Sequence, residues 1–198
     1  MPPNPHPLPT KNFDRVQLPI SKIDNQTYYR LNPVNYTSAI YFDRSGRGRY
    51  DSPSVAYGIC YLGESLEAAF IECFGRQLGV RFLSQEFIKT RNLFTIKSNK
   101  PLTLVDLFGS GLSKIGADSR LTGGNNYQLS RSWAEAIYHH PQQVDGIRYY
   151  SRHDNTQLCC GLFERNSQWF TEQNQGNLVD ADSFGLAEIL KRYDYGIY

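Results

Sequence analysis

Hydrophobic residues recur at helical and strand spacings along the chain, and these spacings predict short elements in a mixed order. Residues 66–74 and 128–139 each carry apolar side chains on one helical face, with Gly75 and Pro141 as stop signals. Because the predicted strands fall in groups with helices inserted between them, we predict a single α+β domain with a mixed sheet core. The other predicted elements are strands over 28–31, 55–62, 93–96, 102–107, 144–151 and 158–164 and short helices over 84–90 and 185–193.

The helix predicted over residues 66–74 starts after a polar residue and carries one acid beside its apolar face. Ser65 is a suitable N-cap, and Glu67 lies in the first turn, where the helix dipole favours negative charge. Glu72 falls at the edge of the apolar stripe. Its carboxylate is therefore expected to be half sheltered, a setting typical of functional acids.

Prolines mark a change in the chain before the first predicted strand. Residues 1–20 contain six of the ten prolines, so they can donate few backbone hydrogen bonds and are expected to form an extended N-terminal arm rather than core. We predict that residues 21–165 form the functional domain. Residues 166–198 are expected to be a C-terminal extension with a short helix that packs on this domain.

The composition of the 198 residues is that of a globular protein, with 40% hydrophobic side chains. The formal net charge of +2 is too small to indicate nucleic-acid binding by itself. No apolar signal segment and no run of membrane-spanning length is found, so we expect a cytoplasmic protein that contacts no membrane. Cys60, Cys73, Cys159 and Cys160 lack the spacing of metal ligands and are expected to be reduced thiols, with no metal site.

Aromatic residues are abundant, with 14 Tyr and 11 Phe. Tyrosine combines an apolar ring with a polar tip, which suits a ligand pocket or an interface as well as an ordinary sheet. These alternatives stay open on the sequence alone, and so does the formation of a homo-oligomer.

A glycine-rich loop carries the residues best suited to bind an anion. Arg47 and Arg49 alternate with Gly48, and Tyr50 follows. A planar guanidinium can donate two hydrogen bonds to one phosphate, and glycine lets the backbone come close to it. The loop therefore suits a pyrophosphate or a nucleic-acid backbone. A solvated basic turn is the alternative.

A carboxylate and a hydroxyl are the other candidates for chemistry. Glu72 can stabilise an oxocarbenium-like transition state by its charge or hold a ribose hydroxyl; the alternative is an ordinary pair with Arg76, one turn further on. Ser151 ends a predicted strand, where its hydroxyl can donate to an amide, a phosphate or a ribose. His153 and Asp154 follow Ser151 too closely in sequence for triad geometry, so we expect no hydrolase triad.

Five short motifs, taken together and in this order, resemble the RES domain family. They are Tyr29-Arg30, Gly48-Arg49-Tyr50, Tyr61, the helix from Ser65 to Glu72, and Gly146-Ile147-Arg148-Tyr149-Tyr150-Ser151. The resemblance covers residues 27–165. Members of this family are toxins of bacterial toxin–antitoxin pairs that degrade NAD+, and their fold is similar to that of ADP-ribosyltransferases.

The resemblance implies a function and a substrate. The chain would cleave the bond between nicotinamide and ribose in NAD+, with water or phosphate as acceptor, and would act as a toxin with a cognate antitoxin partner. NAD+ would be the substrate, and no separate cofactor would be needed. Arg49, alone or together with Arg30, would bind the pyrophosphate, and which of the two is the essential arginine stays open.

The resemblance also implies roles around the sugar and the base. Glu72 would stabilise the ribosyl cation, and Ser151 would anchor the nicotinamide side. Tyr50 and Tyr61 would pack against nicotinamide or ribose. Glu72, Ser151 and Arg49 are therefore the expected catalytic residues.

Two other functions stay open on the sequence. An ADP-ribosyltransferase shares the cleavage step but passes the sugar to a macromolecule. A module for single-stranded nucleic acid would use the arginine–glycine loop and the tyrosines for phosphate and stacking contacts. The near-neutral charge and the acid at Glu72 count against this module, so we expect no direct contact with nucleic acid.

Overall fold

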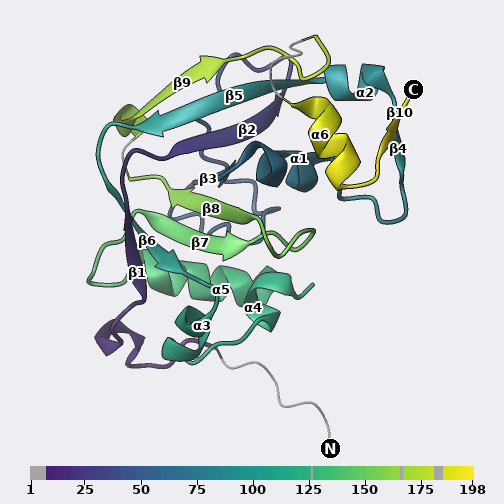
Figure 1. Ribbon diagram of the computed structural model, residues 1–198. Coiled ribbons are helices and arrows are strands. Elements are labelled where there is room, and N and C mark those ends of the chain that lie inside the picture. Colours follow the sequence, from purple (N-terminus) through teal and green to yellow (C-terminus); the bar gives the residue numbers. More distant parts are fainter. Residues whose placement is uncertain (1–7, 126, 166, 181–184) are drawn as a thin grey trace, which may run out of the picture.

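An eight-stranded sheet forms the centre of the molecule (Figure 1). The structure is a computed structural model that describes residues 8–125, 127–165, 167–180 and 185–198. The strand order is β1-β6-β7-β8-β3-β2-β5-β9. The β6–β7 pair is parallel, and the other neighbours are antiparallel. The sheet is therefore mixed, and the predicted α+β class is confirmed.

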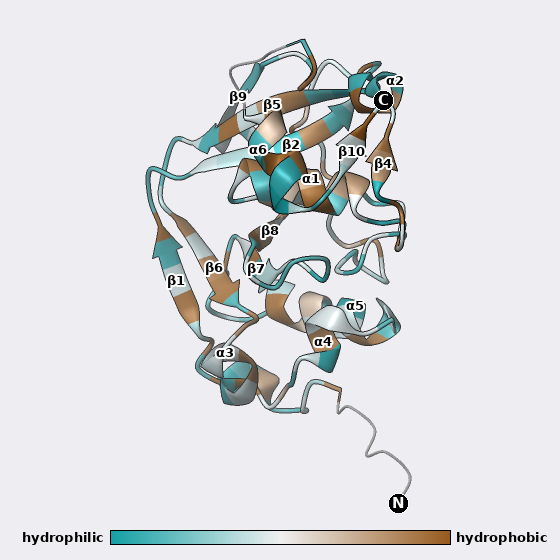
Figure 2. Cartoon of the chain, turned by 45° about the vertical axis from the view of Figure 1, so that its right-hand side comes forward, coloured by the Kyte–Doolittle hydropathy of each residue, from teal (hydrophilic) through white to brown (hydrophobic). Residues whose placement is uncertain are grey.

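The strands of the main sheet are short, and the longest connection between them is that from β6 to β7. The strands of the main sheet are β1 (Ile20–Ile23), β2 (Thr27–Pro33), β3 (Ile59–Gly63), β5 (Arg91–Ser98), β6 (Leu102–Asp106), β7 (Gly146–Tyr150), β8 (Leu158–Phe163) and β9 (Phe170–Asn174). A second, two-stranded sheet consists of β4 (Phe82–Leu83) and β10 (Gly196–Ile197). Strand β1 has hydrophobic residues at both ends and two hydrophilic residues between them (Figure 2).

Six α-helices lie among the described residues, and two of them, α1 and α5, cover one face of the sheet. None is long and apolar enough to span a bilayer in the part of the chain that the structure describes. The helices are α1 (Leu66–Phe74), α2 (Gln85–Lys89), α3 (Ser110–Lys114), α4 (Arg120–Gly123), α5 (Tyr127–Tyr138) and α6 (Leu186–Arg192).

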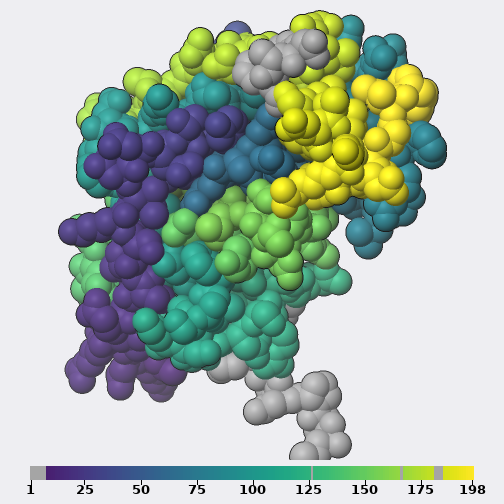
Figure 3. Space-filling view, viewed as in Figure 1, coloured from purple at the N-terminus to yellow at the C-terminus, as the bar shows by residue number. Residues whose placement is uncertain are grey.

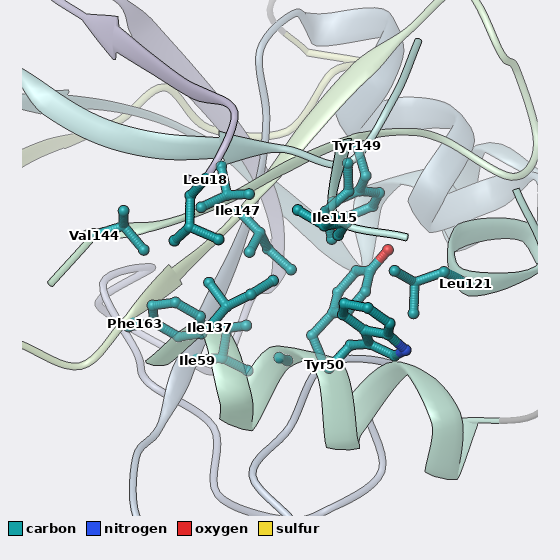
Figure 4. Packing of buried hydrophobic residues seen from close by; sticks show 14 of the residues in the cluster. Leu18, Tyr50, Ile59, Ile115, Leu121, Ile137, Val144, Ile147, Tyr149 and Phe163 are labelled. Atoms are coloured by element: carbon teal, nitrogen blue, oxygen red, sulfur yellow. The ribbon is translucent and has the colours of Figure 1, made fainter. Parts of the chain in front are cut away.

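The two faces of the sheet carry separate hydrophobic clusters. On the face below α5, Ile59, Ile147 and Phe163 pack with Ile137 (Figure 4). Because side chains alternate along a strand, Cys60 points to the opposite face, where it belongs to a different cluster. The α1 and α5 face is the one that carries the candidate site.

Helix α1 starts directly after β3 and lies close to the sheet. The Ser65 hydroxyl accepts a hydrogen bond of 3.0 Å from the backbone N–H of Ala68, so the predicted N-cap is confirmed. Gly63 allows the close approach, because a Cβ there would lie 2.7 Å from the backbone nitrogen of Ala69. This packing fixes the height of α1 above the sheet.

The N-terminal segment belongs to the core where the structure describes it. Phe13 and Leu18 are buried in the cluster below α5, and Ile20–Ile23 pairs with β6. The prediction that residues 1–20 form an arm outside the core is therefore wrong for Phe13 and Leu18. A high proline content limits backbone hydrogen bonds, but it does not prevent single apolar side chains from packing in the core. Residues 1–7 lie outside the described part of the chain.

The C-terminal segment also continues the domain instead of following it. Strand β9 pairs with β5 at the edge of the sheet. The predicted C-terminal helix is α6, and its Ile189 and Leu190 are buried in one cluster with Phe70 and Phe74 of α1. Residue 165 is therefore no structural boundary.

Two other predicted elements differ from the structure. The strand predicted over 55–62 begins only at Ile59, because Val55 adopts a positive φ of 61° within a turn. The glycine-rich segment 109–126, whose sequence predicts mostly loop with one helical turn, contains the two short helices α3 and α4. Both differences arise from local turns that hydrophobic periodicity does not reveal.

The close packing of β7 on β8 leads to a prediction about stability. A Cβ on Gly146 would collide with the carbonyl oxygen of Gly161 and lie 3.0 Å from Cα of Leu162. Because these are backbone atoms that cannot rotate away, Gly146→Ala should lower the free energy of unfolding by about 1–3 kcal/mol, measured by urea denaturation. Gly123→Ala is the control, since its Cβ would point into open space. Equal losses in both variants would contradict this explanation.

Candidate active site

A hydrogen bond between Glu72 and Ser151 forms the centre of the site. Glu72 lies on the last turn of α1 with a half-buried side chain, and Ser151 directly follows β7 and is buried. The Ser151 hydroxyl donates to Oε1 of Glu72 over 2.7 Å. The structure thus brings together two of the predicted catalytic residues, which are 79 positions apart in the chain.

Further contacts hold this pair in place. The backbone N–H of His153 donates to the Ser151 hydroxyl oxygen over 3.1 Å, so this hydroxyl both accepts and donates. Arg76 donates from Nε to the backbone carbonyl oxygen of Glu72 over 2.7 Å. The carboxylate of Glu72 therefore pairs with a buried hydroxyl, whereas Arg76 holds its backbone.

Arg49 is buried with part of its hydrogen-bonding capacity unused. Its side chain is 9% exposed, Nη1 donates to the carbonyl oxygen of Gly124 over 2.6 Å, and the guanidinium lies 4.7 Å from the ring centroid of Tyr127. The buried Nη2 has no hydrogen-bond partner among the described residues. An arginine with one nitrogen paired and another buried without a partner has unused capacity to donate a hydrogen bond to an anionic oxygen.

The charges of Arg49 and Glu72 act on the same neighbours. Burial raises the pKa of Tyr50, Arg49 opposes this rise, and Glu72 adds to it. Burial also lowers the pKa of His153; Glu72 acts against this shift, and Arg49 is one of three guanidinium groups that act with it. The cation and the carboxylate therefore share one electrostatic environment around Tyr50 and His153.

A hydrogen-bond network inside the loop fixes the position of Arg49. Asp51 is buried and accepts from the backbone N–H of Gly48 over 2.7 Å and from the Tyr61 hydroxyl over 2.8 Å. The Tyr61 hydroxyl in turn accepts from the backbone N–H of Tyr50 over 2.9 Å. A Cβ on Gly48 would collide with the Asp51 carboxylate and lie 2.5 Å from the Tyr61 hydroxyl, so a side chain there would displace the groups of this network.

Tyr50 and Tyr61 therefore differ from the surfaces for base or sugar that the resemblance implied. Tyr50 is 0% exposed, and its ring packs 4.9 Å from that of Tyr149 (Figure 4). Its hydroxyl is buried without a hydrogen-bond partner among the described residues. Tyr61 is half-buried and holds the loop through its hydroxyl. Both residues therefore stabilise the loop that carries Arg49.

Arg30 lies apart from this group. It pairs with Phe94 across the β2–β5 ladder, and Phe94 belongs to the cluster on the opposite face of the sheet. Its Nη1 donates to the carbonyl oxygen of Ala39 over 2.8 Å and contacts Sγ of Cys60 at 3.1 Å. The structure does not bring Arg30 to Glu72 or Ser151, because strand alternation turns it to the other side. Of the two arginines, Arg49 is the one whose charge, like that of Glu72, acts on Tyr50 and His153.

Three residues that contact the candidate site residues were not predicted from the sequence in these roles. Asp51 could have been found from its position three residues after Gly48, a spacing typical of side chains that cap a tight turn. Tyr127 gives no local signal, since it lies far from Arg49 in the chain. His153 has no triad geometry with its neighbours, because Ser151 donates to Glu72 and the Asp154 carboxylate accepts from Tyr193 and Thr156. Its contact with Ser151 is made by its backbone N–H.

A cavity of about 380 Å3 lies directly beside Ser151. Apolar and aromatic side chains form one part of its wall, and hydroxyl and amide groups form another. Glu72 and Arg49 do not line it. A larger hollow of about 550 Å3, beside Glu135 and His139, shares no lining residue with it. The walls of the cavity beside Ser151 consist of Leu107, Phe108, Gly109, Leu112, Ser119, Thr122, Gly123, Tyr150, Ser151, Arg152 and Asn155.

The chain matches a known protein family over most of its length. The model of the RES domain matches residues 27–182, which include Arg49, Glu72 and Ser151. The chain therefore belongs to the RES domain family. It is 28% identical over 86 residues to a protein named "Probable toxin y4kH" from Sinorhizobium fredii (strain NBRC 101917 / NGR234), a match that covers 43% of this chain and 67% of that protein.

A solved structure shares the fold. The crystal structure of the M. tuberculosis MbcT–MbcA toxin–antitoxin complex contains a chain that superposes with a TM-score of 0.59 at 14% sequence identity. The match covers 78% of this chain and 87% of that chain. The mixed sheet with its inserted helices is thus an architecture that also occurs in this complex.

The lowered pKa of His153 leads to a prediction about pH. Its folded pKa lies below the ordinary 6.5, so the unfolded chain takes up the proton more readily, and stability is lost as the pH falls from about 6.5 towards the folded value. His153→Gln removes this group but keeps the backbone N–H that contacts Ser151. The difference in free energy of unfolding, wild type minus variant, should be constant at neutral pH and fall below it, measured by urea denaturation from about pH 8 to 5. A flat difference would disprove the assignment.

Proposed function

We propose that this protein degrades NAD+ by cleaving the bond between nicotinamide and ribose. The single observation that carries the proposal is the Glu72–Ser151 hydrogen bond. Near it, Glu72 and Arg49, which has one nitrogen unpaired among the described residues, both act on the charge of His153. A carboxylate, a hydroxyl and a cation are the groups that such a reaction needs at the sugar and at the phosphates. Membership of the RES domain family supports the same reaction.

The chemistry of NAD+ fits a site with one carboxylate at the reacting carbon. Nicotinamide leaves from a pyridinium, so the bonding electrons neutralise its ring nitrogen and no general acid has to protonate it. Positive charge moves to the ribosyl carbon and ring oxygen as the bond breaks. Glu72 stabilises this oxocarbenium-like charge, and Ser151 keeps the carboxylate oriented.

Arg49 supplies the binding energy that places the sugar. Its Nη2 donates to the pyrophosphate, while Nη1 stays on the carbonyl oxygen of Gly124. A charge-assisted hydrogen bond in a buried place is stronger than one in water. The cavity beside Ser151, with Phe108 and Tyr150 in its wall, has the aromatic surface that suits a planar base.

The biological role that we propose is that of a toxin with a cognate antitoxin. The relative from Sinorhizobium fredii is named a probable toxin, and the structural neighbour was solved in a toxin–antitoxin complex. Loss of NAD+ stops energy metabolism, so an enzyme of this kind requires an inhibitor in the cell that makes it. An antitoxin that covers the Glu72–Ser151 pair meets this requirement.

Replacement of the carboxylate tests the reaction. Glu72→Gln keeps the size of the side chain and an acceptor for Ser151 but removes the charge that stabilises the ribosyl cation, so nicotinamide release from NAD+ should fall by about 100-fold or more. Chromatography of nicotinamide measures the rate, and circular dichroism checks the fold. Cells that express the wild-type protein should stop growing, and cells that express Glu72→Gln should continue to grow. Stable NAD+ with folded wild-type protein would refute the proposal.

The labelled products of the same assay identify the acceptor. Free ADP-ribose indicates water, and ADP-ribose 1″-phosphate indicates phosphate. Covalent label on protein or nucleic acid indicates the alternative of an ADP-ribosyltransferase, which shares the cleavage step. Each product would be lost in Glu72→Gln, because all three reactions pass through the same ribosyl cation.

The two arginines provide a matched pair for the binding step. Arg49→Lys replaces the planar fork with a point charge and should raise KM for NAD+ by about tenfold or more. Arg30→Lys removes donors to Ala39 and Cys60 on the opposite face, so it should lower thermal stability and leave KM unchanged. Steady-state kinetics and thermal unfolding distinguish the two, and a larger KM effect at Arg30 would reverse the assignment.

A further inference from the structure

The elements that carry Glu72 and Ser151 both contact a third segment near the C-terminus. This segment consists of α6 and the residues up to Tyr195, and it lies beside α1 in both ribbon views (Figures 1 and 2). In the space-filling view its yellow atoms reach the green atoms of the β7–β8 region (Figure 3). Residues 186–195 lie beyond residue 182, where the match to the RES domain ends.

Tyr193 is the residue of this segment that contacts both elements. Its ring lies parallel to that of Phe70, with an interplanar angle of 2° and centroids 6.3 Å apart. Phe70 is completely buried in α1, two residues before Glu72. The ring of Tyr193 therefore packs on the helix that carries the carboxylate.

The hydroxyl of Tyr193 extends to the turn that carries the catalytic hydroxyl. It donates to Oδ2 of Asp154 over 2.9 Å, and Arg192 lies 3.7 Å from the same oxygen. The other oxygen of Asp154 accepts from the backbone N–H and the hydroxyl of Thr156, over 2.9 and 2.7 Å. The Asp154 side chain is only 14% exposed, and its bond from Tyr193 is partly buried, whereas Thr156 lies at the surface.

The position of Asp154 is transmitted to Ser151 through the backbone of the turn. The N–H of Gln157 donates to the carbonyl oxygen of Asp154 over 3.0 Å, and the N–H of Ser151 donates to the carbonyl oxygen of Gln157 over 2.8 Å. The N–H of His153 binds the Ser151 hydroxyl. A shift of Asp154 would thus move the hydroxyl that orients Glu72.

The C-terminal segment is itself well anchored. Ile189 and Leu190 are buried against α1, the N–H of Tyr195 donates to the carbonyl oxygen of Leu190 over 2.8 Å, and β10 pairs with β4. Tyr193 therefore acts from a fixed base and is no loose tail residue.

We propose that Tyr193 is a positioning residue that sets Ser151 against Glu72, with its ring on α1 and its hydroxyl on the β7–β8 turn. The catalytic consequence rests on the proposed function, whereas the structural link between Tyr193 and the turn does not. Arg192 assists by its charge at Asp154. The C-terminal segment is thus a working part of the site, although it lies outside the family match.

The electrostatics of the turn agree with this role. Burial acts to raise the pKa of Asp154, but the hydrogen bonds from Thr156 and Tyr193 and the charge of Arg192 outweigh burial and leave the pKa below its usual value. The carboxylate is therefore ionised at neutral pH and gives the Tyr193 hydroxyl a charged acceptor, which makes a stronger hydrogen bond than a neutral one.

Tyr193→Phe tests the proposal, because it removes the hydroxyl and keeps the ring on Phe70. We expect kcat for NAD+ cleavage to fall about tenfold with KM changed less than about twofold, since the variant misplaces reacting groups without touching Arg49. We also expect faster hydrogen exchange of the amides of residues 151–157. Tyr195→Phe is the matched control, because its ring also contacts Phe70 but its hydroxyl makes no hydrogen bond to a described residue; it should change neither quantity.

A double-mutant cycle separates positioning from general stability. Asp154→Ala should reproduce the kcat loss, Asp154→Asn should restore part of it through its amide, and Tyr193→Phe should have no further effect in the Asp154→Ala background. Additive losses in the double variant, or unchanged exchange of residues 151–157 in Tyr193→Phe, would overturn the proposal. If wild-type protein does not cleave NAD+, the proposed function fails, and the exchange data alone decide whether Tyr193 holds the turn.

Discussion

The hydrogen bond between Glu72 and Ser151 is the contact on which the arrangement of this site depends. It joins helix α1 to the end of β7, and β8 lies between β7 and the strand that leads into α1. The bond forms only if the height of α1 above the sheet and the register of three strands are all correct. Gly63 and the Ser65 cap set the first condition, and Ser65 also donates to Gln157 of the β7–β8 turn over 2.6 Å. One serine thus ties the start of α1 to the turn that follows β7.

The same site contains buried polar groups that the protein leaves without partners. Nη2 of Arg49 and the hydroxyl of Tyr50 have none among the described residues. A buried donor left unpaired destabilises a fold by about 1–3 kcal/mol, so each such group calls for an explanation. Asp51 and Tyr61 hold the loop rigid in the meantime. The loop therefore holds the guanidinium of Arg49 in one place although one of its nitrogens has no partner among the described residues.

Helix α1, its cap, the position of Glu72 and the strand that leads to Ser151 could be predicted from the sequence, because they depend on local spacing and on single capping residues. The face on which Arg30 lies could not, because alternation shows only that neighbouring residues diverge, while the pairing of β2 with β5 decides which side each takes. Tyr50 is a buried support for the same kind of reason, since burial is set by Tyr149 from a distant strand. Strand β9 (Phe170–Asn174) gave no signal because edge strands can be polar.

The part of the chain beyond residue 182 shows why a family match and a functional unit can differ in length. The turn after β7 is short and polar, so it has little apolar surface with which to fix its own position. A buried hydroxyl at its start must nevertheless be held to hydrogen-bonding distance of a carboxylate on another element. In this chain Ser65 contacts the turn through Gln157, and Asp154 contacts Thr156 within the turn and Tyr193 and Arg192 of the C-terminal segment. The hydroxyl of Tyr193 and the charge of Arg192 thus contribute contacts to a turn that has little apolar packing of its own.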